Sequence, residues 1–194
     1  MKKQKEPSTS VFRPSNRPMA TDSAPNPHPA TRSSSTFAAR KVAAAALIAA
    51  LYIVLTYVAQ SMGLASFAIQ VRFSEALTIL PYFLPMAIPG LFVGCFAANL
   101  LIGSMLLDTV FGSLATLVGA LGTYALRKHK WLAPLPPIVA NVIAVPLILQ
   151  YVYGLEGGLG YFALTVGIGE ILSCGVLGML LLFALERHKT HFPW

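Results

Sequence analysis

The chain has 194 residues, of which 56% are hydrophobic and 11% charged, and its mean hydropathy is +0.68. This composition is too apolar for an ordinary soluble domain, so the sequence predicts an integral membrane protein. The net charge of +7 is concentrated at the N-terminus, because eight basic residues lie at or before Lys41 and the rest of the chain holds six basic against five acidic side chains. A basic face for binding nucleic acid is therefore excluded.

Residues 1–36 are dominated by Ser, Pro, Thr, Asn and Lys. Such a segment cannot bury enough apolar surface to offset its ordering entropy, so we expect a disordered, basic, cytoplasmic leader. The apolar run that follows has no charge between Lys41 and Arg72, which predicts a membrane span at about residues 40–60. Arg40 and Lys41 at its start place the N-terminus in the cytoplasm, because basic residues favour that side.

Residues 73–105 are too many for one span and few for two. The Pro89-Gly90 pair is the natural break, which gives spans at about 73–88 and 90–105. Proline recurs every four residues along the first of these, at Pro81, Pro85 and Pro89. We therefore expect that span to be kinked, short or partly unwound, and packed against protein rather than lipid.

The next predicted span runs from Asp108 to Leu126 and ends at the basic run of residues 127–130. A fifth follows the prolines at 134, 136 and 137 and ends near Tyr153, with a kink expected at Pro146. A sixth covers about 160–185 and ends at another basic run. The prediction is an all-α integral membrane protein with six transmembrane helices in residues 37–188, both termini cytoplasmic, and a short tail at 189–194.

Most polar residues of the apolar region fall near the outer side of this topology. Those proposed as site residues on this basis are Arg72, Glu75, Asn99, Asp108, Gln150, Tyr153 and Glu170. An ionisable group at membrane depth is costly and is by default a functional hypothesis. A one-sided polar pocket is what capture of a small solute requires, whereas an ion pathway needs such groups across the full depth.

Structural roles remain open for several of these residues. Asp108 could cap its helix, and Arg72 and Glu75, three residues apart, could form an ion pair. Asn99 and Asn141 could form hydrogen bonds between helices. A stripe of small residues on the first span favours either internal packing or the approach of another helix, and consists of Ala45, Ala46, Ala49 and Ala50.

Several motifs are absent from the chain. It has no GxxxxGK[ST] loop, no HExxH and no GxSxG, so we expect no ATP binding by the chain itself and no enzyme activity of the protease or lipase type. Cys95 and Cys174 have no partners at zinc or redox spacing, so no metal or other cofactor is predicted. A binding protein without its own energy source implies partner subunits.

Three segments resemble the QueT family, the queuosine-precursor-binding S-components of ECF (energy-coupling factor) transporters: IQVRFSEALTILP, AIPGLFVGCFAANLL and DTVFGSLATLVGA. The resemblance implies six helices with cytoplasmic termini and a substrate pocket near the extracellular face. It also implies an alanine motif on the first helix that docks on a transmembrane T-component, which in turn binds two cytoplasmic ATPases. The alanine stripe fits that motif.

A 7-deazaguanine ligand sets definite demands on such a pocket. Its donor edge suits a carboxylate, either Glu170 or Glu75, and its carbonyl needs a donor such as Asn99, Gln150 or Arg72. Its flat ring suits an aromatic wall, for which the candidates are Phe73, Phe111 and Tyr153. A precursor with an aminomethyl group adds a cation that Asp108 would favour. The alternatives are a solitary carrier or facilitator for a purine-like or vitamin-like solute, and a membrane scaffold without a ligand.

Overall fold

The computed structural model describes residues 30–64 and 70–188, with side chains from Thr36 onward. In this part of the chain all regular elements are helical and no strand occurs, as predicted. The helix α1 (Ala30–Ser61) begins within the predicted leader, earlier than expected. The first 29 residues of that leader and the predicted tail at 189–194 lie outside the described residues.

Five more α-helices follow α1, separated by shorter helical segments. The α-helices are α2 (Ala87–Leu101), α3 (Leu106–Ala125), α4 (Leu135–Leu147), α5 (Leu159–Glu170) and α6 (Gly178–Arg187). The shorter segments are two 3₁₀ helices, η1 (Phe73–Tyr82) and η2 (Lys130–Leu132), and two π-helical segments, η3 (Ile148–Val152) and η4 (Ile171–Leu177).

Among the described residues four helical stretches are long and apolar enough to cross a membrane, and they match the first, fourth, fifth and sixth predicted spans. They are Thr36–Ser61, Leu106–Ala125, Lys130–Val152 and Leu159–Arg187. The other two predicted spans are shorter. The ten residues of η1 and the fifteen of α2 reach only about 20 Å and about 22 Å at the usual rise of each helix type, against about 30 Å of hydrocarbon.

The 3₁₀ helix η1 is the central element of the bundle. Seven of its ten residues are buried, and it contacts α1, α2, α3, η4 and α6. A 3₁₀ helix of this length is unusual; here it ends around Pro81, in the proline-rich stretch. The expected short, irregular segment packed against protein is therefore confirmed.

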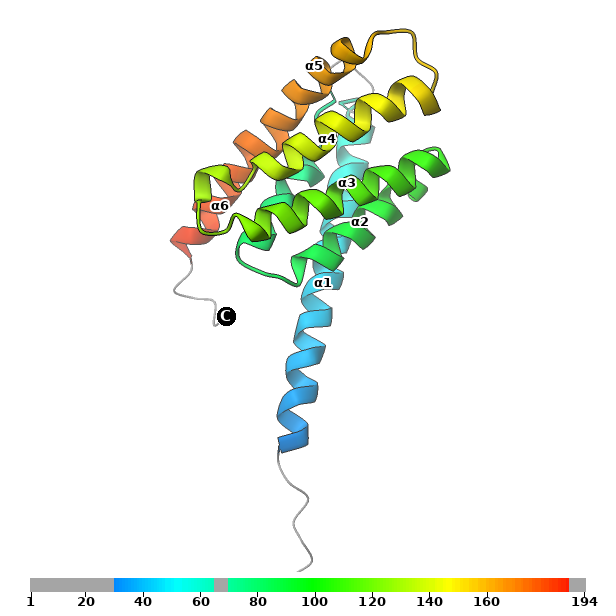
Figure 1. Ribbon diagram of the computed structural model, residues 1–194. Coiled ribbons are helices and arrows are strands. Elements are labelled where there is room, and N and C mark those ends of the chain that lie inside the picture. Colours follow the sequence, from blue (N-terminus) through cyan, green and yellow to red (C-terminus); the bar gives the residue numbers. More distant parts are fainter. Residues whose placement is uncertain (1–29, 65–69, 189–194) are drawn as a thin grey trace, which may run out of the picture.

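The two π-helical segments lie in the fifth and sixth spans. Pro146, near the end of α4, has no backbone N–H to donate, and the helix widens into η3 directly after it. The irregularity expected at Pro146 thus takes the form of a π-helical turn. The segment η4 joins α5 to α6 without a break, so that the three form one long rod (Figure 1).

Helices α1 and α2 pack closely because glycine on α2 faces alanine on α1. A Cβ at Gly90 would lie 2.6 Å from the carbonyl oxygen of Ala45, and one at Gly94 would lie 2.9 Å from Cα of Ala49. The N-terminal part of α1 extends beyond the bundle (Figure 1). The close approach divides the alanine stripe, since Ala45 and Ala49 serve internal packing while Ala46 and Ala50 stay exposed.

We expect Gly90→Ala to lower the thermal unfolding midpoint of the detergent-solubilised protein, because the added methyl group meets backbone rather than a flexible side chain. The cost of such overpacking is about 1–3 kcal/mol. Gly160→Ala is the matched control, since a Cβ there meets nothing within 4 Å. Equal midpoints for the two variants would contradict the packing described here.

Candidate functional site

A polar cavity with two connected chambers lies at one end of the bundle. The outer chamber has a volume of about 290 Å³ and is lined by the end of α1, the start of η1, the α2–α3 turn and the end of the fifth span. The inner chamber holds about 10 Å³ and is lined by η1, α3, α4 and α5. Gln70, Arg72, Asp108 and Val145 line both chambers, so they form the passage between them.

Glu75 lies at the inner end of this cavity, three residues after Arg72. Arg72 directly precedes η1 with extended backbone, Glu75 lies in its first turn, and both residues line the inner chamber. Glu75 is 1% exposed, and its Oε1 accepts a hydrogen bond from the hydroxyl of Tyr52 on α1. Its Oε2 has no hydrogen-bond partner among the described residues. One carboxylate oxygen is therefore buried and available.

Asp108 and Tyr153 meet at the outer chamber. The Tyr153 hydroxyl donates to Asp108 Oδ2 at 2.8 Å and accepts from the backbone N–H of Met105 at 3.3 Å. Asp108 lies in the first turn of α3, but it makes no side-chain capping bond. Its partner is thus a residue 45 positions along the chain, not the end of its own helix.

The ion pair that Arg72 and Glu75 could form is not present. In the described part of the chain the one ion pair within 4.0 Å joins Lys130 and Glu186 at 3.8 Å, at the opposite end of the bundle. The backbone N–H of Arg72 donates to Ser173 Oγ at 3.2 Å, which fixes the segment while its guanidinium lines both chambers. Arg72 is therefore free to donate to a bound molecule.

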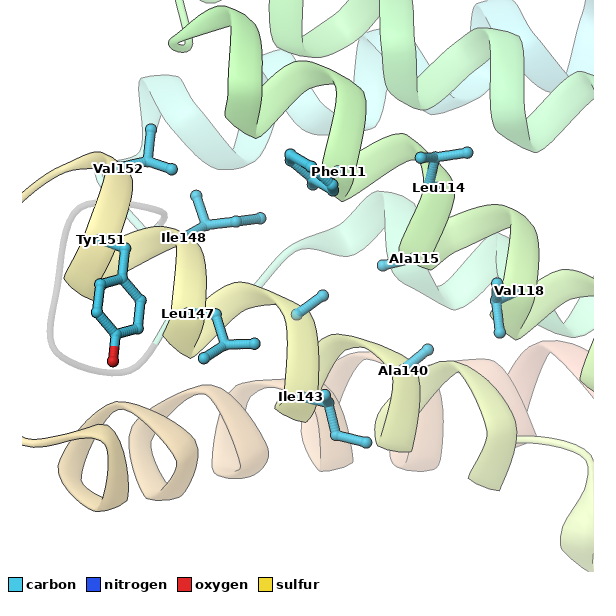
Figure 2. Close-up of a pocket in the computed structure, with 11 residues that line it drawn as sticks. Phe111, Leu114, Ala115, Val118, Ala140, Ile143, Leu147, Ile148, Tyr151 and Val152 are labelled. Carbon is cyan, nitrogen blue, oxygen red and sulfur yellow. The ribbon is translucent and has the colours of Figure 1, made fainter.

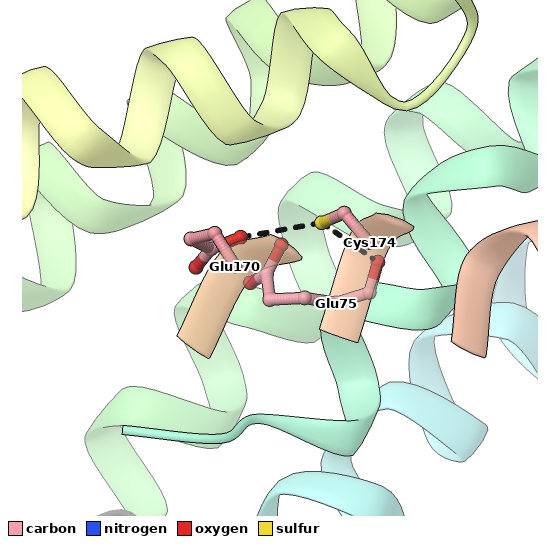
Figure 3. A group of neighbouring side chains, drawn as sticks. All are labelled: Glu75, Glu170 and Cys174. Atoms are coloured by element: carbon pink, nitrogen blue, oxygen red, sulfur yellow. Dashed lines mark hydrogen bonds between the residues drawn. The ribbon is translucent and has the colours of Figure 1, made fainter. Parts of the chain in front are cut away.

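Glu170 lines the inner chamber from the sixth span, and Cys174, one helical turn further along, lies beside it. Figure 3 shows their side chains beside that of Glu75. The Cys174 thiol lies 3.2 Å from Glu170 Oε2 and 3.4 Å from the backbone carbonyl oxygen of Glu75. Glu170 is 5% exposed, so two carboxyl groups and a thiol from distant segments share one buried space.

The remaining proposed residues lie elsewhere. Phe111 is 52% exposed and lines an apolar groove of about 630 Å³ between α3 and α4, together with Leu114, Ile143 and Tyr151 (Figure 2). Asn99 is buried beside Gly112, its Nδ2 3.7 Å from Cys95 Sγ. Neither these two residues nor Gln150 and Phe73 line the polar cavity.

Several lining residues were not proposed from the sequence. Asn141 of α4 lines the inner chamber with Glu75 and Glu170, and Gln70 lies in the passage. Tyr52 of α1 bonds Glu75 directly. The sequence signal for Asn141 was its polarity within an apolar helix, which a hydrogen bond between helices would also explain. Gln70 directly precedes the charged segment, and nothing in its local pattern marks it.

The helices and the cavity together define a class: a multi-pass membrane protein with a polar cavity between its helices. A comparison with protein families identifies the family within this class. The family model described as QueT transporter matches residues 42–187, well over half of the chain. The chain belongs to the QueT transporter family, and the resemblance found in its sequence is confirmed. No curated protein and no solved structure matches it.

We expect Tyr153→Phe to lower the thermal unfolding midpoint, because Asp108, 8% exposed, would lose the hydroxyl that donates to it. Leaving a buried acceptor without its partner costs about 1–3 kcal/mol. Tyr151→Phe removes a hydroxyl from a neighbouring side chain that is 71% exposed and should shift stability by less than about 0.5 kcal/mol. If both variants melt with the parent, the bond to Asp108 contributes nothing.

Proposed function

We propose that this protein is the substrate-binding subunit, or S-component, of an ECF-type importer, and that it captures a queuosine precursor of the 7-deazaguanine type at the extracellular side. Membership of the QueT transporter family supports transport of a small molecule. The observation that carries the proposal is the two-chambered polar cavity, in which Arg72 and Asp108 line the passage and carboxylates close the inner end.

The distribution of charge supports an extracellular opening for the cavity. The turn after α3 and the end of α6 meet at the Lys130–Glu186 ion pair, and both regions are basic, with Arg127, Lys128 and Arg187 nearby. Basic residues favour the cytoplasmic side. The cavity lies at the other ends of the same helices, so six crossings with cytoplasmic termini would open it to the outside.

The chamber volumes determine how a bicyclic ligand would fit. The outer chamber, at about 290 Å³, is close to the lower end of the about 300–1,000 Å³ common for ligand pockets. The inner chamber, at about 10 Å³, is near the minimum for one water molecule. The ring therefore belongs in the outer chamber, against Tyr153, with its donor edge directed inward.

In this arrangement each polar group of the ligand meets a suitable side chain. Glu75 and Glu170 at the inner end accept from the ring's N–H and amine donors, and Arg72 donates to its carbonyl oxygen. Asp108, at the passage, favours a positively charged substituent. The ligand would thereby supply partners for Arg72 and for the unpaired oxygen of Glu75.

We expect Glu75→Gln and Glu170→Gln each to weaken binding of a 7-deazaguanine precursor by the purified protein. A hydrogen bond to a charged group contributes about 1.5–3 kcal/mol, which is about tenfold or more in Kd. Isothermal titration calorimetry in detergent measures this, with Glu156→Gln as the control because Glu156 lies exposed in the α4–α5 turn. Parent-like affinity in both variants would overturn the ligand assignment.

The exposed part of the alanine stripe is the proposed contact with the T-component. Ala46 and Ala50 are one helical turn apart and exposed, and the N-terminal part of α1 stands clear of the bundle (Figure 1). Small side chains let a second helix approach closely in a membrane. Ala45 and Ala49 are excluded from this contact by their packing against α2.

We expect Ala46→Trp to abolish ATP-driven uptake in proteoliposomes that also contain the T-component and both ATPases, while ligand affinity in detergent stays at the parental level. The bulky ring would block close helix contact but is far from the cavity. Leu164→Trp, at a position 64% exposed on α5, is the control. Uptake by the chain alone, without ATPases, would instead favour the solitary carrier.

A further inference from the structure

We propose that the cluster of Glu75, Glu170 and Cys174, which borders the inner chamber, is a binding site for a Zn²⁺ ion, with these three side chains as its protein ligands. One oxygen of each carboxylate and the sulfur of Cys174 all lie within 4.8 Å of one another. Figure 3 shows the three side chains converging from η1, α5 and η4. The inference goes beyond the proposed function, because it needs no organic ligand and gives a role to Cys174, which the proposed function does not use.

The first argument is the unpaired oxygen of Glu75. Its Oε2 is fully enclosed and has no hydrogen-bond partner among the described residues. Burying such an acceptor without a donor or a cation is costly, and native interiors rarely leave one alone. The carboxyl group lies beside that of Glu170 (Figure 3), so a cation between them would satisfy both.

The second argument is the charge balance around the cavity. Three carboxyl groups line it, those of Glu75, Asp108 and Glu170, against one guanidinium, that of Arg72. No other Lys, Arg or His occurs between Lys41 and Arg127, and none occurs between residues 131 and 186. Arg72 forms no ion pair within 4.0 Å in the described part of the chain. A divalent cation would offset the thiolate formed at Cys174 and one of the carboxylates.

The chemistry of the ligands selects the metal. A thiolate with two carboxylates suits Zn²⁺, whereas Ca²⁺ and Mg²⁺ require six or more oxygen ligands. Zinc bonds of about 2.0–2.3 Å place tetrahedral ligands about 3.3–3.8 Å apart. Cys174 Sγ and Glu170 Oε2 are already 3.2 Å apart. On coordination the thiol loses its proton to solvent.

The inner chamber, which Glu75 and Glu170 line beside the cluster, is too small for an organic group. A volume of about 10 Å³ accepts one water-sized particle. Three protein ligands leave a fourth zinc position for a water molecule or a bound ligand, which is the arrangement of an open site. Because Glu75 Oε1 already accepts from Tyr52, zinc and the proposed precursor would compete for Glu75 Oε2.

The test is metal binding by the chelator-treated full chain in detergent. We expect the parent to bind one Zn²⁺ in the cavity by isothermal titration calorimetry, and Co²⁺ in its place to give a thiolate-to-metal charge-transfer band in the near ultraviolet. That band distinguishes cysteine coordination from binding at histidines such as His129 and His188. Cys174→Ser should abolish the band and weaken Zn²⁺ binding by about tenfold or more, since losing an outer partner alone costs that much.

Cys95→Ser is the matched control, because Cys95 is equally buried but belongs to no such cluster. It should keep the band and the parental Zn²⁺ affinity. Glu170→Gln, which keeps the thiol, should also weaken Zn²⁺ binding and covers the case in which Cys174→Ser does not fold. No band in the parent, or a band that survives in Cys174→Ser, overturns the site. Precursor binding is measured separately on the same samples, so failure of the proposed function is recognised independently.

Discussion

The burial of three carboxyl groups with one guanidinium inside an apolar bundle is the constraint on which the structure depends. A charge at membrane depth is tolerated where it faces the bundle interior and finds a partner. Glu75 finds the hydroxyl of Tyr52 and Asp108 finds that of Tyr153. Both partners are neutral donors from other spans, so the polar contacts hold the helices around the cavity without neutralising it.

The irregular helices follow from the same constraint. The 3₁₀ helix η1 begins directly after Arg72 and holds Glu75 in its first turn, so that both residues line the inner chamber, and its ten residues make it shorter than a regular span. Its irregular backbone is acceptable because it is buried in protein and borders a cavity. A glycine on α5 allows the segment before η1 to pack closely, because a Cβ at Gly169 would lie 1.9 Å from the carbonyl oxygen of Gln70. The neighbouring Glu170 can therefore lie near the start of η1.

The sequence predicted the parts of this arrangement that follow from the free-energy cost of placing charge inside a membrane. Charge in an apolar segment is expensive, and that rule alone found Arg72, Glu75, Asp108 and Glu170 as site candidates; the cavity collects all four. The four long spans followed from hydropathy in the same way. The sequence did not predict which direction each side chain faces, because that depends on how each helix is rotated about its own axis. Phe111 precedes Gly112, which lines the inner chamber, and one residue turns a helix by about 100°, so Phe111 faces the apolar groove.

Helix phase also explains why the alanine stripe has two roles. Ala45 and Ala49 share one line along α1 and Ala46 and Ala50 share the next, so a helix packed against the first line leaves the second exposed. The sequence could name the four residues, but it could not say which line the glycines of α2 would cover. Because α1 also supplies Tyr52 to Glu75, one helix connects the exposed alanines to the inner end of the cavity. A displacement of α1 by a docking partner would therefore act directly on the carboxylate that closes the site.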